Sequence, residues 1–413
     1  MIVQIKDKSL FRFDIYDFSL TIYLCVLLAH QQENTIELLM RYVSLAFVIG
    51  VYSYRFIRMP EVRGFYRYYI LWLSALLGYG LLSMVWSIDP SNVFSTLYNI
   101  LKVSLVCIVL LPKLGTMKDI EHVLRIVLLA LCYMVLLLII RTPFSTWGTD
   151  RIGSAINQHS NSIGRFANIG LLLSLYFCME TKAQRTKLFY FVLMLIFTVC
   201  ALLTGSKNAI FIMIFQIGLY FYVISNNRKR FGIVFFSLLG VVALFWMVMN
   251  IQGLYDLVGI RLERMFALFM PKSNVTVDGS TMERMYFMRS GWRLFKQHPV
   301  IGVGMNNFSA YLRTIGYRNA KYSHSGFVEI LSTLGIVGFV LYYRIFFKTF
   351  ALCLKATLRR NRLLALLFVH TACMFVFDIS TISMYNYFEY VLLLLAFCAA
   401  NISLRQERRD ELI

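Results

Sequence analysis

A histidine and several arginines lie in one long polar stretch, residues 280–338, of an otherwise apolar sequence. His324 stands there in the run KYSHSGF, directly before an apolar segment. Because histidine accepts a proton near neutral pH, His324 could orient or deprotonate an acceptor hydroxyl group. An interfacial histidine that only hydrogen-bonds a neighbour is the alternative interpretation. We therefore treat His324 as the candidate catalytic residue.

Cationic side chains are expected on the outer face: Arg151, Arg165 and Lys207 at the membrane boundary, and Arg284 and Arg289 in the long polar stretch. A cation that dips toward the membrane core costs roughly 3 kcal/mol, so such residues are usually paired or serve a site. Snorkelling to lipid phosphates is the simpler explanation for any one of them. Few carboxylates accompany the set, and this imbalance favours binding of an anionic ligand.

The carboxylates of the same loops do not suggest a metal site. They form no DxD or HExxH-like cluster and comprise Asp89, Asp150, Asp256, Asp278 and Glu283. Fixed guanidinium and ammonium groups can themselves stabilise the charge that builds on a leaving diphosphate when its bond to a sugar breaks. We therefore expect metal-independent chemistry and no cofactor.

Smaller polar features accompany these candidates. His159 and Asn157 stand close to Arg151 in the sequence and could contact sugar hydroxyls, although a solvated loop explains them equally well. Gly302 and Gly304, in the run IGVGMNNF, predict a tight turn that returns the long loop to the membrane.

The elements that must position these residues are apolar segments. The chain has 413 residues, of which 59% are hydrophobic and 15% are charged, and its apolar segments approach the length of a membrane-crossing helix. These values predict an all-α polytopic membrane protein with about twelve transmembrane helices. The predicted spans are 17–30, 36–54, 68–86, 95–112, 122–140, 163–180, 188–204, 208–225, 231–251, 326–347, 363–380 and 384–403.

The net charge of +20 comes largely from basic clusters between these segments. Alternate loops carry the clusters, which predicts that those loops and both termini are cytoplasmic, and nucleic-acid binding is not expected. Three regions follow: an N-terminal bundle of about nine spans over 1–250, an external loop over 251–325, and a C-terminal bundle with a cytoplasmic tail over 326–413. Apolar spacing predicts two short helices in the loop, one over 258–269 and one over 285–296 that ends before Pro299.

Several runs, taken in order, resemble the O-antigen ligase and polymerase family, membrane glycosyltransferases that act on undecaprenyl-diphosphate-linked glycans. The resemblance rests on Glu283 with Arg284, on HPVIGVGMNNF and on HSGFVEILSTLGIVG. The runs LLSMVWSIDP, RIGSAINQHSNSIG and LLTGSKNAI agree in order, so the resemblance covers most of the chain. Ser325 stands where the family often has asparagine. Lys207 stands where arginine is more common, which keeps the charge but loses the bidentate fork.

The resemblance implies an all-helical fold whose external loop caps a cavity on the periplasmic side of the inner (plasma) membrane. Arg284, Arg151 and Lys207 would hold the diphosphate, with Arg165 and Arg289 as further contacts. His324 would position or activate the acceptor hydroxyl. The implied partners are an undecaprenyl-diphosphate-linked glycan and membrane lipids, with a chain-length regulator as a further candidate.

The favoured function is a surface polysaccharide polymerase that transfers the glycan to the terminal sugar of another lipid-linked repeat unit. An O-antigen ligase, whose acceptor is a lipid A core sugar, shares the donor chemistry and remains open. A transporter or flippase of a lipid-linked substrate would need charged residues within the spans, for which Lys102 and Glu389 are the candidates. A non-catalytic scaffold of an envelope complex is the remaining possibility.

Overall fold

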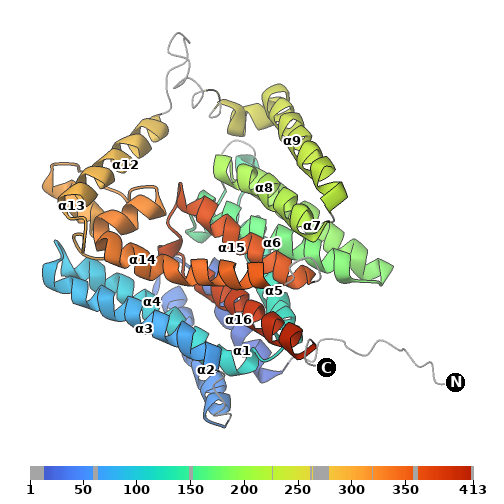
Figure 1. Cartoon of the computed structure of the whole chain (residues 1–413). Helices are drawn as coiled ribbons and strands as arrows, with labels where there is room; N and C mark the ends of the chain where they lie inside the picture. Colours follow the sequence, from blue (N-terminus) through green and yellow to red (C-terminus); the bar gives the residue numbers. More distant parts are fainter. Residues whose placement is uncertain are drawn as a thin grey trace.

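The computed structural model describes residues 14–58, 64–147, 152–225, 227–260, 263, 279–318, 320–356 and 361–410, and over these residues the fold is helical (Figure 1). Each of the twelve predicted spans coincides with a helix. These helices are α1 (Ile15–Ala29), α2 (Thr35–Arg58), α3 (Gly64–Leu82), α4 (Pro90–Leu110), α5 (Met117–Arg141), α6 (Ser160–Glu180), α7 (Gln184–Leu203), α8 (Lys207–Ile224), α9 (Asn227–Asn250), α14 (Gly326–Lys355), α15 (Arg362–Asp378) and α16 (Tyr387–Asp410). The prediction of a polytopic all-α membrane protein is therefore confirmed.

The exact number of spans stays a prediction. Within the described ranges, nine helices are long and apolar enough to cross a membrane, namely α2 to α8, α14 and α16. Helix α1 has 15 residues and α15 has 17, so both are shorter than a full crossing. Short helices connect the long ones. They are η1 (Ser83–Trp86), η2 (Leu111–Lys113), η3 (Phe144–Thr146), η4 (Ser154–Ile156), α10 (Gln252–Leu254), η5 (Tyr255–Gly259) and η7 (Ser383–Tyr385).

Local sequence explains where several helices begin. Helix α4 starts after Asp89, whose carboxylate accepts a hydrogen bond from the Ser91 backbone N–H at 3.0 Å. Pro90 occupies the first helical position. A backbone N–H has no partner within the helix there, so proline loses no hydrogen bond. Helix α5 starts with a capping box, in which Thr116 and Asp119 each accept a hydrogen bond from the other's backbone N–H. These polar caps fix the helix ends against which the loops are built.

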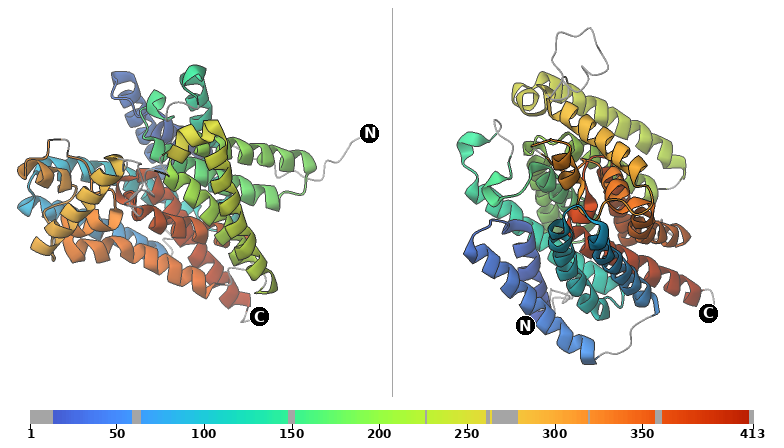
Figure 2. Two further views of the ribbon diagram at one scale, coloured as in Figure 1. Left: turned by 90° about the horizontal axis from the view of Figure 1, so that it is seen from above. Right: turned by 90° about the vertical axis from the view of Figure 1, so that its left-hand side faces the viewer.

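Helices α6 and α16 form the centre of the bundle. Of the most apolar window in each, 83% of the residues are buried, compared with 17% in α7. Gly170 allows close packing of α6 on α7, because a Cβ atom there would lie 2.4 Å from the Phe197 ring. Helix α9 lies at the periphery beside α8 in all three views (Figures 1 and 2). The central position of α6 and α16 brings their N-terminal ends to the candidate site.

The segment over residues 251–325 is helical in its second half, as predicted. Helix α12 (Gly279–Gln297) ends two residues before Pro299 and packs against α14. A Cβ atom at Gly291 would lie 2.4 Å from Val328, so glycine allows this close approach. The helix predicted over 258–269 lies largely outside the described residues. Helix α13 (Phe308–Thr314) was not predicted, because its seven residues are too few to show a periodic pattern.

Helix α14 is interrupted at Gly335, which has φ 66° and ψ −168°. The segment that follows α12 forms backbone hydrogen bonds with α14 at this break. The Gly304 N–H donates to the Thr333 carbonyl at 2.9 Å, and the Ile336 N–H donates to the Pro299 carbonyl at 2.9 Å. The expected turn is present, since Gly302 and Gly304 have φ of 66° and 97°. The loop therefore supplies bonds that an unbroken helix would have made within itself.

A third segment joins this arrangement from the start of α4. The Ile88 N–H donates to the Val303 carbonyl at 3.3 Å, the Met305 N–H to the Ser83 hydroxyl at 3.1 Å, and the Asp89 N–H to the Asn307 side-chain oxygen at 2.6 Å. We call residues 83–89, 299–307 and 333–337 the glycine-turn unit. Three of the runs that carry the family resemblance thus meet in one hydrogen-bonded structure that holds α14 at its break.

Candidate functional site

His324 lies in a short loop between α13 and α14 and has an unusual backbone. Its φ is 59°, in the left-handed region that residues other than glycine seldom adopt. Such conformations persist where the surroundings over-determine them, which is often the case at functional sites. The next residue, Ser325, is the N-cap of α14, and its side chain accepts from the Val328 N–H. Asparagine caps helices equally well, so Ser325 keeps the local role of the residue that the family often has there.

Two buried carboxyl residues hold this loop. Glu329 is 1% exposed, and its carboxylate accepts a hydrogen bond from the Ser323 N–H at 2.8 Å. Asp378, at the end of α15, accepts from the Ser325 hydroxyl through its backbone carbonyl at 3.3 Å. Sequence reasoning missed Glu329, although a lone carboxylate one turn inside an apolar helix is a signal of function or of a specific partner. Its role here is to position the loop that carries His324.

Aromatic rings enclose the His324 side chain. The Phe287 ring of α12 stacks on the imidazole with a centroid distance of 5.9 Å and an interplanar angle of 15°. The Tyr322 ring lies 4.3 Å away, centroid to centroid. Within the part of the chain that the structure describes, the buried Nδ1 atom of His324 has no hydrogen-bond partner. The imidazole is therefore held by ring contacts, and its Nδ1 atom makes no hydrogen bond to the described residues.

The electrostatic surroundings keep His324 neutral. Burial has the largest effect and, together with the charges of Arg284, Lys321 and His159 in that order, lowers the pKa of the imidazole to about 4. Arg284 is half-buried on α12, one turn before Phe287, and Lys321 lies 3.3 Å from the Glu283 carboxylate. A neutral imidazole can accept a proton at physiological pH. The structure thus brings together His324, Arg284 and His159, three of the residues that the sequence predicted for the site.

A cavity of about 240 Å³ opens next to this group, and we call it the histidine cavity. It is lined by His159, Asn161, Ser162, Arg165, Tyr322, Thr381, Ile382, Tyr385 and Asn386. Tyr322 links the cavity to His324, since its ring contacts the imidazole. The N-terminal end of α6 and the loop between α15 and α16 form most of the wall. Space for a substrate therefore adjoins the candidate catalytic residue.

Arg165 lines this cavity but already has partners. Its guanidinium is 3.4 Å from the Glu389 carboxylate and donates to the Ser383 hydroxyl at 2.8 Å. Glu389 also lies 3.0 Å from His370 Nε2. The side chain of Arg165 is almost fully buried, and a buried cation needs such compensation. Arg165 consequently stiffens the cavity wall, and its charge is largely balanced by Glu389.

The remaining predicted residues differ in their surroundings. Lys207 is half-buried at the first position of α8, and the neighbouring Asn208 donates to the Ser380 hydroxyl, so this helix end meets the loop that lines the cavity. Arg289 is exposed on α12. Asn157 is exposed and donates to the Gln31 carbonyl at 2.8 Å, which holds two loops together. Arg151 lies outside the described residues.

The arrangement resembles no metal centre. Within the described ranges, His, Cys, Asp and Glu side chains do not gather in groups of three or more that could hold a metal ion. The groups near His324 are cationic or neutral, apart from Glu283 and the buried Glu329. A cationic site of this kind suits an anionic ligand, whose charge the guanidinium of Arg284 can bind.

Comparison with known proteins supports the resemblance noted in the sequence. Residues 189–343 match a family model described as O-antigen ligase. The match includes Lys207, Arg284 and His324, and it extends through the break in α14. No curated protein matches the chain. The family signal therefore rests on the segment that contains α12, the histidine loop and two of the three parts of the glycine-turn unit, residues 299–307 and 333–337. Over residues 189–343, this chain is therefore similar to the O-antigen ligase family.

Proposed function

We propose that this protein is a surface polysaccharide polymerase of the inner (plasma) membrane. It transfers a growing glycan from undecaprenyl diphosphate to the terminal sugar of another lipid-linked repeat unit. The observation that carries the proposal is the neutral, partly unpartnered His324 beside Arg284 at the edge of the histidine cavity. The family match supports a function of the ligase or polymerase type in general, with lipid-linked glycans as substrates.

The chemistry assigned to the site is a single displacement at the donor sugar. The bond between the anomeric carbon and the diphosphate oxygen breaks, and a bond from that carbon to the acceptor hydroxyl oxygen forms. His324 takes the hydroxyl proton, and undecaprenyl diphosphate leaves with the bonding electron pair. Arg284, with Lys207 and Arg151, stabilises the negative charge that builds on the leaving group. Arg289 contributes on the outer surface, and Arg165 supports the wall through its pair with Glu389.

The topology proposed with this function keeps both termini in the cytoplasm and the histidine cavity on the periplasmic side. Residues 251–325 form the external loop that caps the site between the two bundles. The packing of α12 on α14 supports this role, because it brings Arg284 close enough to His324 for its charge to act on the imidazole.

A ligase is the second candidate, favoured by the description of the matched family. The deciding experiment supplies purified protein in lipid nanodiscs with lipid-linked repeat units alone. A polymerase lengthens the glycan, which is measured as a ladder of products on a gel. Absence of chain growth until lipid A core is added would overturn the polymerase and establish the ligase. Movement of the lipid-linked substrate across the membrane without any new glycosidic bond would instead identify a transporter.

Metal independence is a testable part of the proposal. Transfer by the purified protein is expected to continue at an unchanged rate after treatment with excess EDTA, because fixed cations take the role of a metal ion. The measurement is the initial rate with and without the chelator, followed by addition of Mg²⁺ or Mn²⁺. A rate that falls to background with EDTA and returns with either ion would contradict the proposal.

The rate of transfer is expected to fall on the acid side only at low pH; we call this fall the acid limb of the pH profile. His324 acts in its neutral form, and burial together with the neighbouring charges lowers the pKa of the free enzyme's imidazole to about 4. Activity is therefore present above this pKa and lost as the pH falls through it, so kcat/KM should stay level from pH 7.5 to about 5.5. An unperturbed histidine would lose half of its activity near pH 6.5.

A variant tests the cause of this shift. Lys321→Gln removes one of the positive charges that lower the pKa of His324, so its acid limb should move to higher pH than that of the natural protein. Arg313→Gln, an exposed cation on α13, serves as the control and should leave the limb in place. Identical acid limbs in all three proteins would show that the limb does not report His324.

A further inference from the structure

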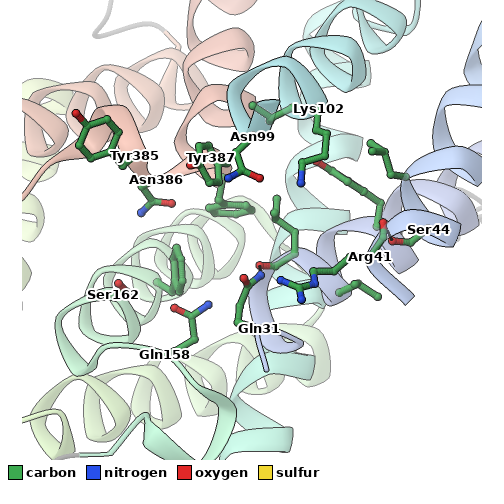
Figure 3. Close-up of a pocket in the computed structure, with 17 residues that line it drawn as sticks. Gln31, Arg41, Ser44, Asn99, Lys102, Gln158, Ser162, Tyr385, Asn386 and Tyr387 are labelled. Carbon is green, nitrogen blue, oxygen red and sulfur yellow. Dashed lines mark hydrogen bonds between the residues drawn. The ribbon is translucent and has the colours of Figure 1, made fainter. Parts of the chain in front are cut away.

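A second cationic pocket adjoins the histidine cavity. Its volume is about 300 Å³, and it is formed between α1, α2, α4, the start of α6 and the loop before α16 (Figure 3). The two cavities share Ser162, Tyr385 and Asn386 in their walls. Of the residues predicted for diphosphate binding, the four that the structure describes, Arg165, Lys207, Arg284 and Arg289, do not line this pocket. We call it the lysine pocket, after Lys102.

Two positive charges face this pocket from different helices. Arg41 of α2 and Lys102 of α4 both reach toward the hollow in Figure 3. They are close enough for the charge of Arg41 to act on Lys102. Like charges at a partly buried position repel each other, and each loses hydration there. The arrangement is therefore unfavourable unless an anion occupies the space between them.

Neither cation has a carboxylate within 4 Å in the part of the chain that the structure describes. Glu37, one turn before Arg41, lies 3.3 Å from Arg141 and 3.4 Å from His30. Lys102 sits over the Tyr98 ring at 4.5 Å, and Arg41 donates to the Gln32 carbonyl at 3.2 Å. The buried Nε of Arg41 has no hydrogen-bond partner among the described residues. Both side chains are thus held in place with their charges uncompensated.

The position of the pocket indicates where its ligand comes from. Lys102 lies in the middle of α4, a helix apolar enough to cross the membrane, and Arg41 lies on α2, which is another such helix. An anion held between these helices is more readily the head group of a lipid than a soluble ion, because its hydrophobic chains remain in the bilayer. Amide side chains, among them Asn99 and Asn386, add donors for phosphate or sugar oxygens.

We propose that the lysine pocket binds the diphosphate head group of the acceptor lipid, a second site beside the one for the donor. This inference rests on the proposed function, because a polymerase must hold two lipid-linked substrates at once, whereas a ligase needs one diphosphate site. The lysine pocket and the histidine cavity lie side by side, since Ser162, Tyr385 and Asn386 line both of them. The acceptor's sugar chain can then reach the histidine cavity while its diphosphate stays with Arg41 and Lys102.

The test measures binding directly, without the transfer reaction. Undecaprenyl diphosphate is titrated into the purified full-length protein in detergent, and the bound molecules are counted by native mass spectrometry. Two molecules are expected for the natural protein and one for the variant Arg41→Gln with Lys102→Gln. The affinity of the lost site should fall at least tenfold, since each charged hydrogen bond removed is worth that much. Arg313→Gln should bind two, and Arg41→Lys should keep the second site.

Three outcomes would overturn the inference. One is a single bound molecule in the natural protein that persists in the double variant. Another is displacement from the second site by inorganic pyrophosphate as effectively as by the lipid, which would identify a free anion as the ligand. The third is equal displacement by phosphatidylglycerol, which would identify an ordinary anionic lipid. Two-site binding in a protein that shows no chain growth would keep the pocket and reject only the polymerase.

Discussion

Replacing His324 with glutamine is expected to reduce glycan transfer about 10²- to 10⁴-fold, the range that a positioned proton acceptor contributes. Glutamine keeps much of the size and hydrogen-bonding capacity of histidine, but it cannot take the hydroxyl proton. The aromatic contacts of Phe287 and Tyr322 should retain the loop around the substituted side chain. Binding of the donor lipid should change little, because Arg284 and Lys207 remain.

The measurement separates chemistry from binding. Initial rates of chain growth give the loss in transfer, and titration with undecaprenyl diphosphate gives the donor affinity. His298→Gln is the matched control, since His298 is exposed just after α12, outside the histidine cavity. The control should retain full activity. Equal activity of the two variants, or a parallel loss of donor affinity with His324→Gln, would remove His324 from the proton-transfer role.

The membrane helices could be predicted because their signal is local. An apolar segment of about twenty residues indicates a span wherever it occurs, and caps such as Asp89 and Thr116 mark the starts. Helix α12 was predicted for the same reason, since its apolar residues recur at helical spacing and Pro299 follows its end. The seven residues of α13 carry no comparable pattern.

The partners of buried charges could not be predicted. Arg165 and Glu389 form an ion pair although they are more than two hundred positions apart in the chain. Nothing in either neighbourhood indicates which helix supplies the opposite charge, because that depends on how the bundle packs. The sequence also could not show that Arg41 of α2 and Lys102 of α4 face the same pocket. Sequence reasoning could identify cations in unusual places, but only the fold shows which of them are compensated.

Glycine runs were the most ambiguous part of the sequence. Gly302 and Gly304 were predicted to form a turn, and they do, but the sequence did not show what the turn contacts. The break in α14 was hidden for a physical reason: the residues around Gly335 are apolar, so hydropathy alone reads them as one continuous helix. The hydrogen bonds across the break join residues that are about thirty to forty positions apart, such as Gly304 with Thr333 and Ile336 with Pro299.

Replacing Gly335 with alanine is expected to destabilise the protein by at least about 3 kcal/mol, because strain and overpacking act together. Gly335 has φ 66° and ψ −168°, a conformation that residues with a Cβ atom seldom adopt. A Cβ atom there would also lie 2.1 Å from the Val300 carbonyl oxygen, which is backbone and cannot rotate away. Relief would require the glycine-turn unit to separate, leaving the carbonyls of Pro299 and Thr333 without their donors.

Two control variants divide this effect into its causes. Gly316→Ala introduces a side chain at φ 87°, but no atom lies within 4 Å of the new Cβ, so it should cost only the backbone strain of about 1–2 kcal/mol. Gly240→Ala, within the exposed part of α9, meets neither obstacle and should be neutral or slightly stabilising. The midpoint temperature of thermal unfolding in one detergent ranks the three. If Gly335→Ala and Gly316→Ala had the same midpoint temperature, the close contact with Val300 would not limit stability. The geometry of the break in α14 would then depend on the backbone freedom of glycine alone.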